Sequence, residues 1–160
     1  MNIITKKLHI PKKRLVIDTT SLISYFDNVF EQGSQISKEA LKIIDNAFGS
    51  RHETILIIPG VVFVEIFDKW FQGSGREEFQ AKFLAEVLSP IIQAPNIEIR
   101  EIDQEILEKF ISLQDIKLNL ENRDRLILAI ASVLNAPLIT SDRKIIRFVK
   151  KYKPISEVIY

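Results

Sequence analysis

The sequence contains no cysteine and, in 160 residues, only two histidines, one methionine, five glycines and six prolines. Without cysteine the chain has no disulfide, no thiol nucleophile and no zinc site of the cysteine type. His9 and His52 stand outside any metal-ligand spacing, and no serine has an identifiable histidine partner, which argues against a serine hydrolase. No apolar run approaches the ~20 residues of a membrane span, and the start does not resemble a secretory signal. We therefore predict a cytoplasmic protein with no membrane segment.

The content of apolar and charged residues is that of one ordinary globular domain. Hydrophobic residues make up 46% of the chain and charged residues 27%, which is enough apolar material for a single core. We predict one domain over residues 14–160, preceded by a basic extension over residues 1–13.

The net charge of +1 hides an uneven distribution of charge. Residues 1–14 and 143–153 contain no acid and together hold 11 of the 22 basic residues, so the rest of the chain carries 21 acidic and 11 basic residues. Basic ends therefore flank a body with a net charge of −10. Such patches could contact phosphates, although solvated helix and tail surface explains them equally well.

Short apolar runs alternate with longer helical patterns, which predicts parallel strands covered by helices. We expect a three-layer α/β/α sandwich around a central parallel, Rossmann-like sheet. The predicted strands are 14–18, 54–58, 97–101, 137–140 and 156–159. The predicted helices are 20–31, 37–48, 60–71, 76–92, 103–115, 122–134 and 142–151.

Four acids interrupt or adjoin apolar segments, where carboxylates are uncommon. Asp18 ends one predicted strand and Asp142 follows another, Glu65 lies within an apolar helix, and Asp124 lies in the first turn of a further helix. Because ligands bind at the carboxyl ends of parallel strands, we expect these acids to converge there. Clustered carboxylates need a compensating cation, and oxygen ligands without cysteine or histidine favour Mg²⁺ or Mn²⁺.

Each acid also has a structural interpretation. Asp18 and Asp142 could cap the following helices, although Thr20 or Ser21 could cap the first of these and leave Asp18 free for a metal. Glu65 could pair with Lys69 at i,i+4 on a helix. Asp124 could simply interact with a helix dipole.

Each of the four acids lies in a short apolar motif, and in order these are LVIDTTSLI at 15–23, VFVEI at 62–66, DRLILAIA at 124–131 and LITSDR at 138–143. Together they resemble the successive acidic motifs of PIN domains, in particular those of VapC-like ribonucleases. The resemblance covers residues 14 to 148 and implies a Mg²⁺- or Mn²⁺-dependent endoribonuclease, commonly dimeric and often inhibited by a small antitoxin protein.

The resemblance further implies that Asp18, Glu65, Asp124 and Asp142 form the catalytic, metal-binding quartet. Thr140 matches a hydroxyl beside the last acid, and Thr20 stands where the family often has Asn or Ser. We expect Asp18, Asp124 and Asp142 to hold the principal ion, with Glu65 completing its shell or orienting the attacking water. The residues Arg143, Lys144 and Arg147 are predicted to bind the RNA backbone.

Two other functions remain open at this stage. A PIN-like module could bind RNA or a protein partner without cleavage if the acids prove unable to hold a metal. Alternatively, a phosphatase-like enzyme could use Asp18 as the phosphoryl acceptor beside Lys144. Release of inorganic phosphate from small esters would distinguish the phosphatase from a nuclease, which shortens RNA.

Overall fold

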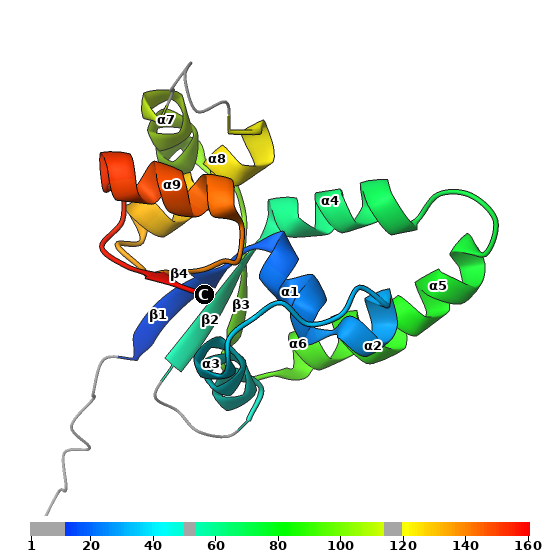
Figure 1. Ribbon diagram of the computed structural model, residues 1–160. Coiled ribbons are helices and arrows are strands. Elements are labelled where there is room, and N and C mark those ends of the chain that lie inside the picture. The colour runs from blue at the N-terminus through cyan, green and yellow to red at the C-terminus, as the bar shows by residue number, and fades with distance from the viewer. Residues whose placement is uncertain (1–11, 50–53, 114–119) are drawn as a thin grey trace, which may run out of the picture.

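The computed structural model describes residues 12–49, 54–113 and 120–160, and in these residues five parallel strands form one sheet (Figure 1). The strand order across the sheet is β3-β2-β1-β4-β5. The inner strands are almost continuously apolar because helices cover both faces of the sheet. The strands are β1 (Lys13–Ile17), β2 (Thr54–Pro59), β3 (Ile97–Arg100), β4 (Leu138–Ile139) and β5 (Val158–Ile159).

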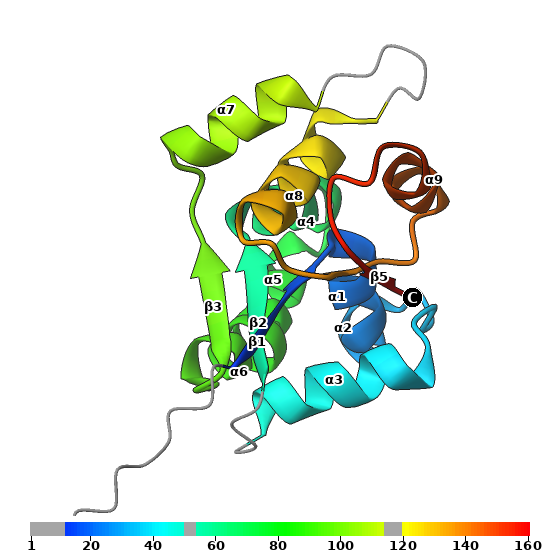
Figure 2. The same ribbon diagram turned by 90° about the vertical axis from the view of Figure 1, so that its left-hand side faces the viewer.

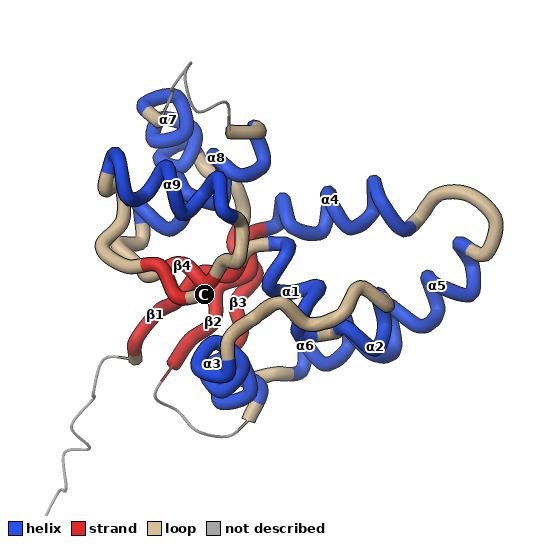
Figure 3. Tube along the Cα trace, in the orientation of Figure 1, coloured by secondary structure: helices blue, strands red, loops and turns tan. Residues whose placement is uncertain are grey.

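Helices form the two outer layers, which confirms the predicted three-layer α/β/α sandwich (Figures 1 and 2). On one side of the sheet lie α7 (Gln104–Ser112), α8 (Asn122–Val133) and α9 (Arg143–Tyr152). On the other side lie α1 (Thr19–Tyr25), α2 (Asp27–Phe30), α3 (Lys38–Phe48) and α6 (Ser89–Gln93). Two further helices, α4 (Gly60–Trp70) and α5 (Arg76–Phe83), extend beyond the sheet as a hairpin (Figure 3).

The single helix predicted over 20–31 is wrong, because the chain forms α1 and α2 with a break at Phe26. Phe26 has φ −97° and ψ 38°, outside the helical region. Its ring is buried and makes edge contacts with Tyr25 and Phe48, at centroid distances of 5.0 and 5.7 Å. The contacts of this aromatic side chain accompany the change in helix direction, which local periodicity does not reveal.

The helix predicted over 76–92 is continuous but contains a π-helical turn, η1 (Leu84–Leu88), between α5 and α6. The N–H of Ser89 donates to the carbonyl of Leu84, five residues earlier. Pro90, which follows, has no N–H and would crowd the carbonyl four residues before it in a regular α-helix. The wider turn admits this proline without breaking the segment.

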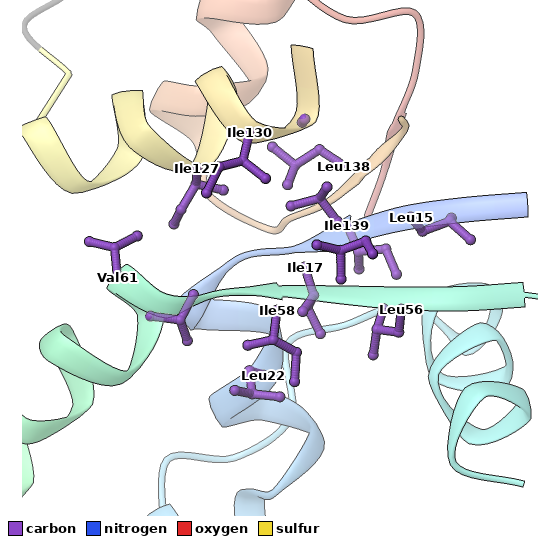
Figure 4. Packing of buried hydrophobic residues seen from close by; sticks show 14 of the residues in the cluster. Leu15, Ile17, Leu22, Leu56, Ile58, Val61, Ile127, Ile130, Leu138 and Ile139 are labelled. Atoms are coloured by element: carbon purple, nitrogen blue, oxygen red, sulfur yellow. The ribbon is translucent and has the colours of Figure 1, made fainter. Parts of the chain in front are cut away.

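The core lies between the sheet and both helical layers. Ile127 and Ile130 of α8 and Leu22 of α1 are at most 1% exposed, and Figure 4 shows them on opposite sides of the sheet residues Ile17 and Ile58. Burying each such side chain contributes about 1.5–3 kcal/mol. This packing fixes the starts of α1 and α8 relative to the ends of the strands.

Lys13 is already part of β1, so the sheet begins one residue before the predicted start at 14. Most of the predicted basic extension, residues 1–11, lies outside the described residues. Across the three described stretches of chain, no helix has both the length and the apolar character of a membrane span.

Candidate acidic active site

A pocket of about 270 Å³ lies at the carboxyl ends of β1 and β4. All four predicted acids line it, although they come from four separate segments of the chain. Its lining consists of Asp18, Thr19, Thr20, Glu65, Lys69, Glu121, Arg123, Asp124, Ile127, Asp142 and Lys144. The topology therefore brings together the acids that the sequence singled out.

Asp18 follows β1 directly and is only 2% exposed. Its Oδ1 accepts a hydrogen bond from the Ser21 N–H at 2.8 Å, so Asp18 itself caps α1. Of the possible caps that the sequence offered, Asp18 is therefore the one used, and Thr20 and Ser21 are not. The backbone of Asp18 is extended, with φ −88° and ψ 174°, and this conformation directs the carboxylate to the first turn of the helix.

Burial raises the pKa of Asp18 above its ordinary value, and hydrogen bonds from Thr140 and Ser21 oppose this rise without cancelling it. Oδ2 of Asp18 accepts from Thr20 Oγ1 at 2.9 Å and also from Thr140 Oγ1. Since each carboxylate oxygen has two acceptor sites, Oδ1 keeps capacity for one further ligand.

Thr140 links two of the acids. Its hydroxyl donates to Asp18 and accepts from the N–H of Asp142 at 3.0 Å, and the side chain is fully buried. Thr20 Oγ1 lies 3.4 Å from Ser141 Oγ, which adds a second contact between the same two segments. Both predicted supporting hydroxyls therefore connect the end of β1 with the segment after β4.

Asp142 caps α9, so its structural interpretation also holds. Its Oδ1 accepts from the N–H groups of Lys144 and Ile145 at 2.6 and 3.3 Å. Within residues 12–49, 54–113 and 120–160, nothing donates a hydrogen bond to its Oδ2. Capping uses one oxygen and leaves the other for a ligand.

Asp124 lies in the first turn of α8, as predicted. Burial, followed by the charges of Asp142, Glu121, Glu65 and Asp18, raises its pKa to about 6. The positive end of the helix dipole would lower this pKa, so desolvation and like charges outweigh the dipole here. No described residue forms a hydrogen bond or ion pair with Asp124.

Glu65 both lines the pocket and pairs with Lys69, whose Nζ lies 2.7 Å from Oε1. Its side chain is 13% exposed, against 51% for that of Lys69. Burial alone would raise the pKa of Glu65, but the hydrogen bond and charge of Lys69, with Arg123 nearby, lower it below the ordinary value. The helix-pairing interpretation is therefore confirmed alongside the position in the pocket.

Sequence reasoning missed Glu121 and Arg123. Glu121 occupies the N-cap position of α8, and Arg123 forms ion pairs with Asp68 at 3.2 Å and Glu121 at 3.8 Å. Glu121 precedes Asp124 by three residues, a spacing that puts two side chains on one side of a helix start. That spacing was the available signal for a fifth acid.

The three cations predicted to bind substrate lie on α9, and of these Lys144 lines the acidic pocket. Arg143 and Arg147 are exposed on the same helix. None of these three side chains forms an ion pair with a described acid.

The acids fit a hard divalent cation by the chemistry of their donors, although their side chains are not gathered around one point. Among the residues that the structure describes, no group of three or more acidic or histidine side chains is arranged to hold a metal ion. All donors are nonetheless oxygens, and the negative charge around Asp124 favours a cation over an empty site. Oxygens with spare capacity remain on Asp18, Asp124 and Asp142.

Comparisons with known proteins agree with this architecture. Similar solved structures include VapBC2 from Rickettsia felis bound to a DNA fragment from their promoter, with 16% identity, a TM-score of 0.63, and coverage of 92% of this chain and 98% of that chain. FitAcB from Neisseria gonorrhoeae has 10% identity, a TM-score of 0.59 and coverage of 91% and 96%. A toxin-antitoxin complex from Klebsiella pneumoniae has 20% identity, a TM-score of 0.55 and coverage of 89% and 95%. At these identities the likeness shows a shared fold.

A comparison with curated protein sequences finds no match. The family model described as PIN domain matches residues 15–151, which includes every acid of the pocket. Since this match spans most of the 160 residues, the chain belongs to the PIN domain family.

Proposed function

We propose that this protein is a divalent-metal-dependent endoribonuclease that hydrolyses RNA phosphodiester bonds. The observation that carries the proposal is the convergence of Asp18, Glu65, Asp124 and Asp142 on one pocket, where burial, followed by the neighbouring negative charges, raises the pKa of Asp124. A structural role alone does not require four negative charges from four segments to meet. Membership of the PIN family supports the same conclusion.

In this proposal Asp18, Asp124 and Asp142 hold Mg²⁺ or Mn²⁺. When bound, such an ion activates water, neutralises charge on the phosphoryl oxygens and stabilises the leaving oxygen. Glu65 either completes the coordination through water or orients the attacking water. The pairing of Glu65 with Lys69 keeps this carboxylate ionised.

The four acids differ in what each can do. Asp18 is fixed by the Ser21 N–H and the Thr140 hydroxyl, so it serves as a rigid anchor. Asp124, with a pKa of about 6, exchanges a proton near neutral pH. A cation competes with that proton, and metal affinity should therefore rise with pH up to and beyond about 6.

A non-catalytic RNA- or protein-binding module is the second candidate. Two observations favour it. Although the four acids line one pocket, no three of the described acidic side chains are close enough together to hold a metal ion, and Glu65 already forms an ion pair with Lys69. The phosphatase alternative has less support. Asp18 is 2% exposed and both of its oxygens accept hydrogen bonds, which is unfavourable for a nucleophile.

The test is cleavage of labelled single-stranded RNA by purified protein in EDTA and after addition of Mn²⁺ or Mg²⁺. We expect no products in EDTA and internal cleavage with either ion, with single-stranded DNA of the same sequence as the substrate control. Cleavage that persists in EDTA would contradict the metal-dependent chemistry. RNA binding without any cleavage in Mn²⁺ would favour the binding module.

The exposed cations Arg143, Lys144 and Arg147 are proposed to guide the RNA backbone towards the acids. Replacing all three with Ala should weaken RNA binding and flatten its dependence on salt, by roughly 0.7 in slope for each lost phosphate contact. A salt dependence equal to that of the wild type would mean that these three residues are solvated and make no contact with the RNA.

We further propose a small antitoxin protein as a partner. The support is that the similar structures from Klebsiella pneumoniae and Rickettsia felis are a toxin-antitoxin complex and VapBC2 on promoter DNA. A short neighbouring reading frame for a DNA-binding protein that blocks cleavage on addition would support this partner. A homodimer, measurable by light scattering, and a cytoplasmic location remain predictions.

A further inference from the structure

A second cavity lies at the opposite end of α9 from the acidic pocket. It has a volume of about 710 Å³ and is formed by the end of α8, the last turns of α9 and the segment that contains β5. We call it the distal cavity, and Asn135, Ile146, Lys150, Lys153, Glu157 and Tyr160 are among the residues that line it. The proposed chemistry at the acidic pocket does not use it.

Helix α9 connects the two cavities. Lys144 near its start lines the acidic pocket, and Lys150 near its end lines the distal cavity. Figure 1 shows the start of α9 facing the starts of α1 and α4, with its end pointing away from them. A helix of 10 residues is about 15 Å long, so this is the span between the two regions.

One face of α9 presents cations along this whole span. Ile145, Phe148 and Val149 are buried, while basic residues occupy the opposite face. Arg143, Arg147 and Lys150 follow at i, i+4 and i+7, a spacing that puts side chains in one row along a helix. In the described parts of the chain these three have no acidic partner, whereas Arg14 and Arg123 elsewhere are both in ion pairs.

The distal cavity extends this positive row. Lys150 and Lys153 bring two ammonium groups to it, and neither forms an ion pair with a described residue. Glu157 also lines the cavity, but its carboxylate forms an ion pair with Lys13 at 3.7 Å. Ile146 supplies apolar surface, and Tyr160 is 63% exposed, so a ring is available for stacking on a base.

Lys153 ends α9 in the left-handed conformation, with φ 50°, where glycine is strongly preferred. Glycine can therefore replace this lysine without backbone strain, so the contribution of its ammonium group can be tested separately from the helix end.

We infer that the distal cavity is an accessory subsite for the RNA strand, which runs from the acidic pocket along the cations of α9. This inference rests on the proposed ribonuclease function and deepens it by assigning a minimum length to the substrate. The positive charge of the distal cavity suits a polyanion. Because the cations of α9 run from the acidic pocket to this cavity, the polyanion is the RNA strand that also enters the acidic pocket. With about 3.4 Å per stacked nucleotide, the 15 Å span corresponds to about four or five nucleotides.

The test measures RNA affinity against length by fluorescence anisotropy, with the full chain and labelled oligonucleotides of about 4 and about 12 nucleotides. The wild type should gain affinity with length, and the double variant Lys150→Ala, Lys153→Gly should lose that gain, on the order of tenfold. Its salt slope for the longer strand should fall by about 1.4, or 0.7 for each lost contact. The matched control is Lys38→Ala, Lys42→Ala, which removes two exposed cations from α3 on the other side of the sheet.

Lys153→Gly alone separates RNA binding from helix termination. Glycine suits the left-handed position, so the melting temperature should be unchanged or higher while affinity for the longer RNA falls. A lower melting temperature with unchanged affinity would assign Lys153 to the helix end and overturn the inference. Unchanged RNA affinity with lost binding of an antitoxin protein would also overturn it, in favour of a protein interface.

The two proposals fail in different ways. If the wild type binds the longer RNA through Lys150 and Lys153 but never cleaves it in Mn²⁺, the ribonuclease proposal fails and the subsite stands as a binding site. If cleavage requires Mn²⁺ and the double variant binds both lengths like the wild type, the subsite fails and the nuclease stands.

Discussion

The two ends of α9 adjoin regions of opposite charge, an acidic pocket and a basic cavity, and the charges in these regions are held in different ways. At its start, Asp142 and Asp18 are fixed by backbone N–H groups and by the Thr140 hydroxyl, in a pocket closed by the strand ends. At its other end, Lys150 and Lys153 lie around a larger cavity without ion pairs to described residues. Hydrogen bonds therefore hold the two carboxylates in fixed positions. The lysine side chains, without such contacts, can change conformation to meet a ligand.

This difference suits the two groups of charges to different roles, catalysis for the acids and attraction of RNA for the lysines. Buried, hydrogen-bonded charges interact strongly and are screened little by salt, so they suit chemistry at one atom. Exposed cations on long side chains interact weakly and are screened within about 8–10 Å at ordinary salt concentrations, so they suit attraction of a polyanion. Substitutions at the acidic end should therefore change rate and stability, and those at the basic end should change affinity.

The largest expected effect comes from Asp124→Asn. It removes the acid that exchanges a proton near neutral pH, and kcat in Mn²⁺ should fall by about 10² to 10⁴-fold. Single-turnover cleavage of labelled RNA measures this, with Asp27→Asn as control, because Asp27 also lies in the first turn of a helix but is exposed. A variant that cleaves like the wild type would remove Asp124 from the site.

The next effect tests the link between the two acids. Thr140→Val keeps the shape of the side chain but takes a donor from buried Asp18 and an acceptor from the Asp142 N–H. Leaving such groups unpaired costs about 1–3 kcal/mol, so unfolding in denaturant should occur at correspondingly lower concentration.

Thr54→Val provides the control for this experiment, because the Thr54 hydroxyl at the start of β2 makes no hydrogen bond with a described residue. Equal stability of the two valine variants would show that the hydroxyl of Thr140 does not hold the acids together.

A smaller effect concerns the dependence of stability on pH. The pKa of Asp124 in the folded protein is raised to about 6, so ionisation is unfavourable there and the native state loses stability as pH rises from about 4 through 6. Allowing for solvent screening of this partly exposed group, the loss is about 1–2 kcal/mol. Asp124→Asn should remove it.

The measurement is chemical denaturation of wild type and Asp124→Asn in EDTA at low and neutral pH. The variant should match the wild type below about pH 4 and be more stable above about pH 6. Saturating Mn²⁺ should reverse the order at neutral pH, because a ligand at about 100 times its Kd stabilises the native state by about 2.7 kcal/mol. A variant less stable than the wild type at every pH would instead assign Asp124 to the helix start.

The smallest effect is expected at Lys69. Lys69→Met removes the partner of Glu65, and because Lys69 is half exposed the cost is about 0–1 kcal/mol. The pKa of Glu65 is lowered in the folded protein, so this stabilisation is present at neutral pH and is lost as pH falls through the lowered pKa.

The same variant should bind Mn²⁺ more tightly in calorimetry, since a competing cation has left the pocket. Lys42→Met, at an exposed position on α3, is the control. Weaker binding of Mn²⁺ by Lys69→Met would mean that the ion pair positions Glu65 for the metal.

Sequence patterns predicted the elements whose signals are local. The apolar run Leu15 to Ile17 and the proline and glycine before Val61 indicated a strand and a helix start in the right places. Parallel topology then located Asp18 and Asp142 at one edge of the sheet. These predictions needed only periodicity and the rule for ligands in parallel sheets.

Features set by tertiary packing were not predicted. The break at Phe26 accompanies contacts with Phe48, which lies on another helix. The sequence offered Asp18 as one of several possible caps of α1, and the extended backbone of Asp18 decides among them. Whether Lys150 forms an ion pair with the described residues depends on which side chains lie near it in the folded protein, and helical periodicity does not reveal this.

The hydrogen bond between Thr140 and Asp18 joins residues 122 positions apart. A ribosome that adds about 5–20 residues per second needs roughly 6 to 24 s to travel between them. During this interval the emerging chain carries Asp18 but neither Thr140 nor Asp142, so it has no complete acidic pocket. For the proposed ribonuclease, the order of synthesis therefore keeps each nascent chain inactive until β4 and α9 have emerged.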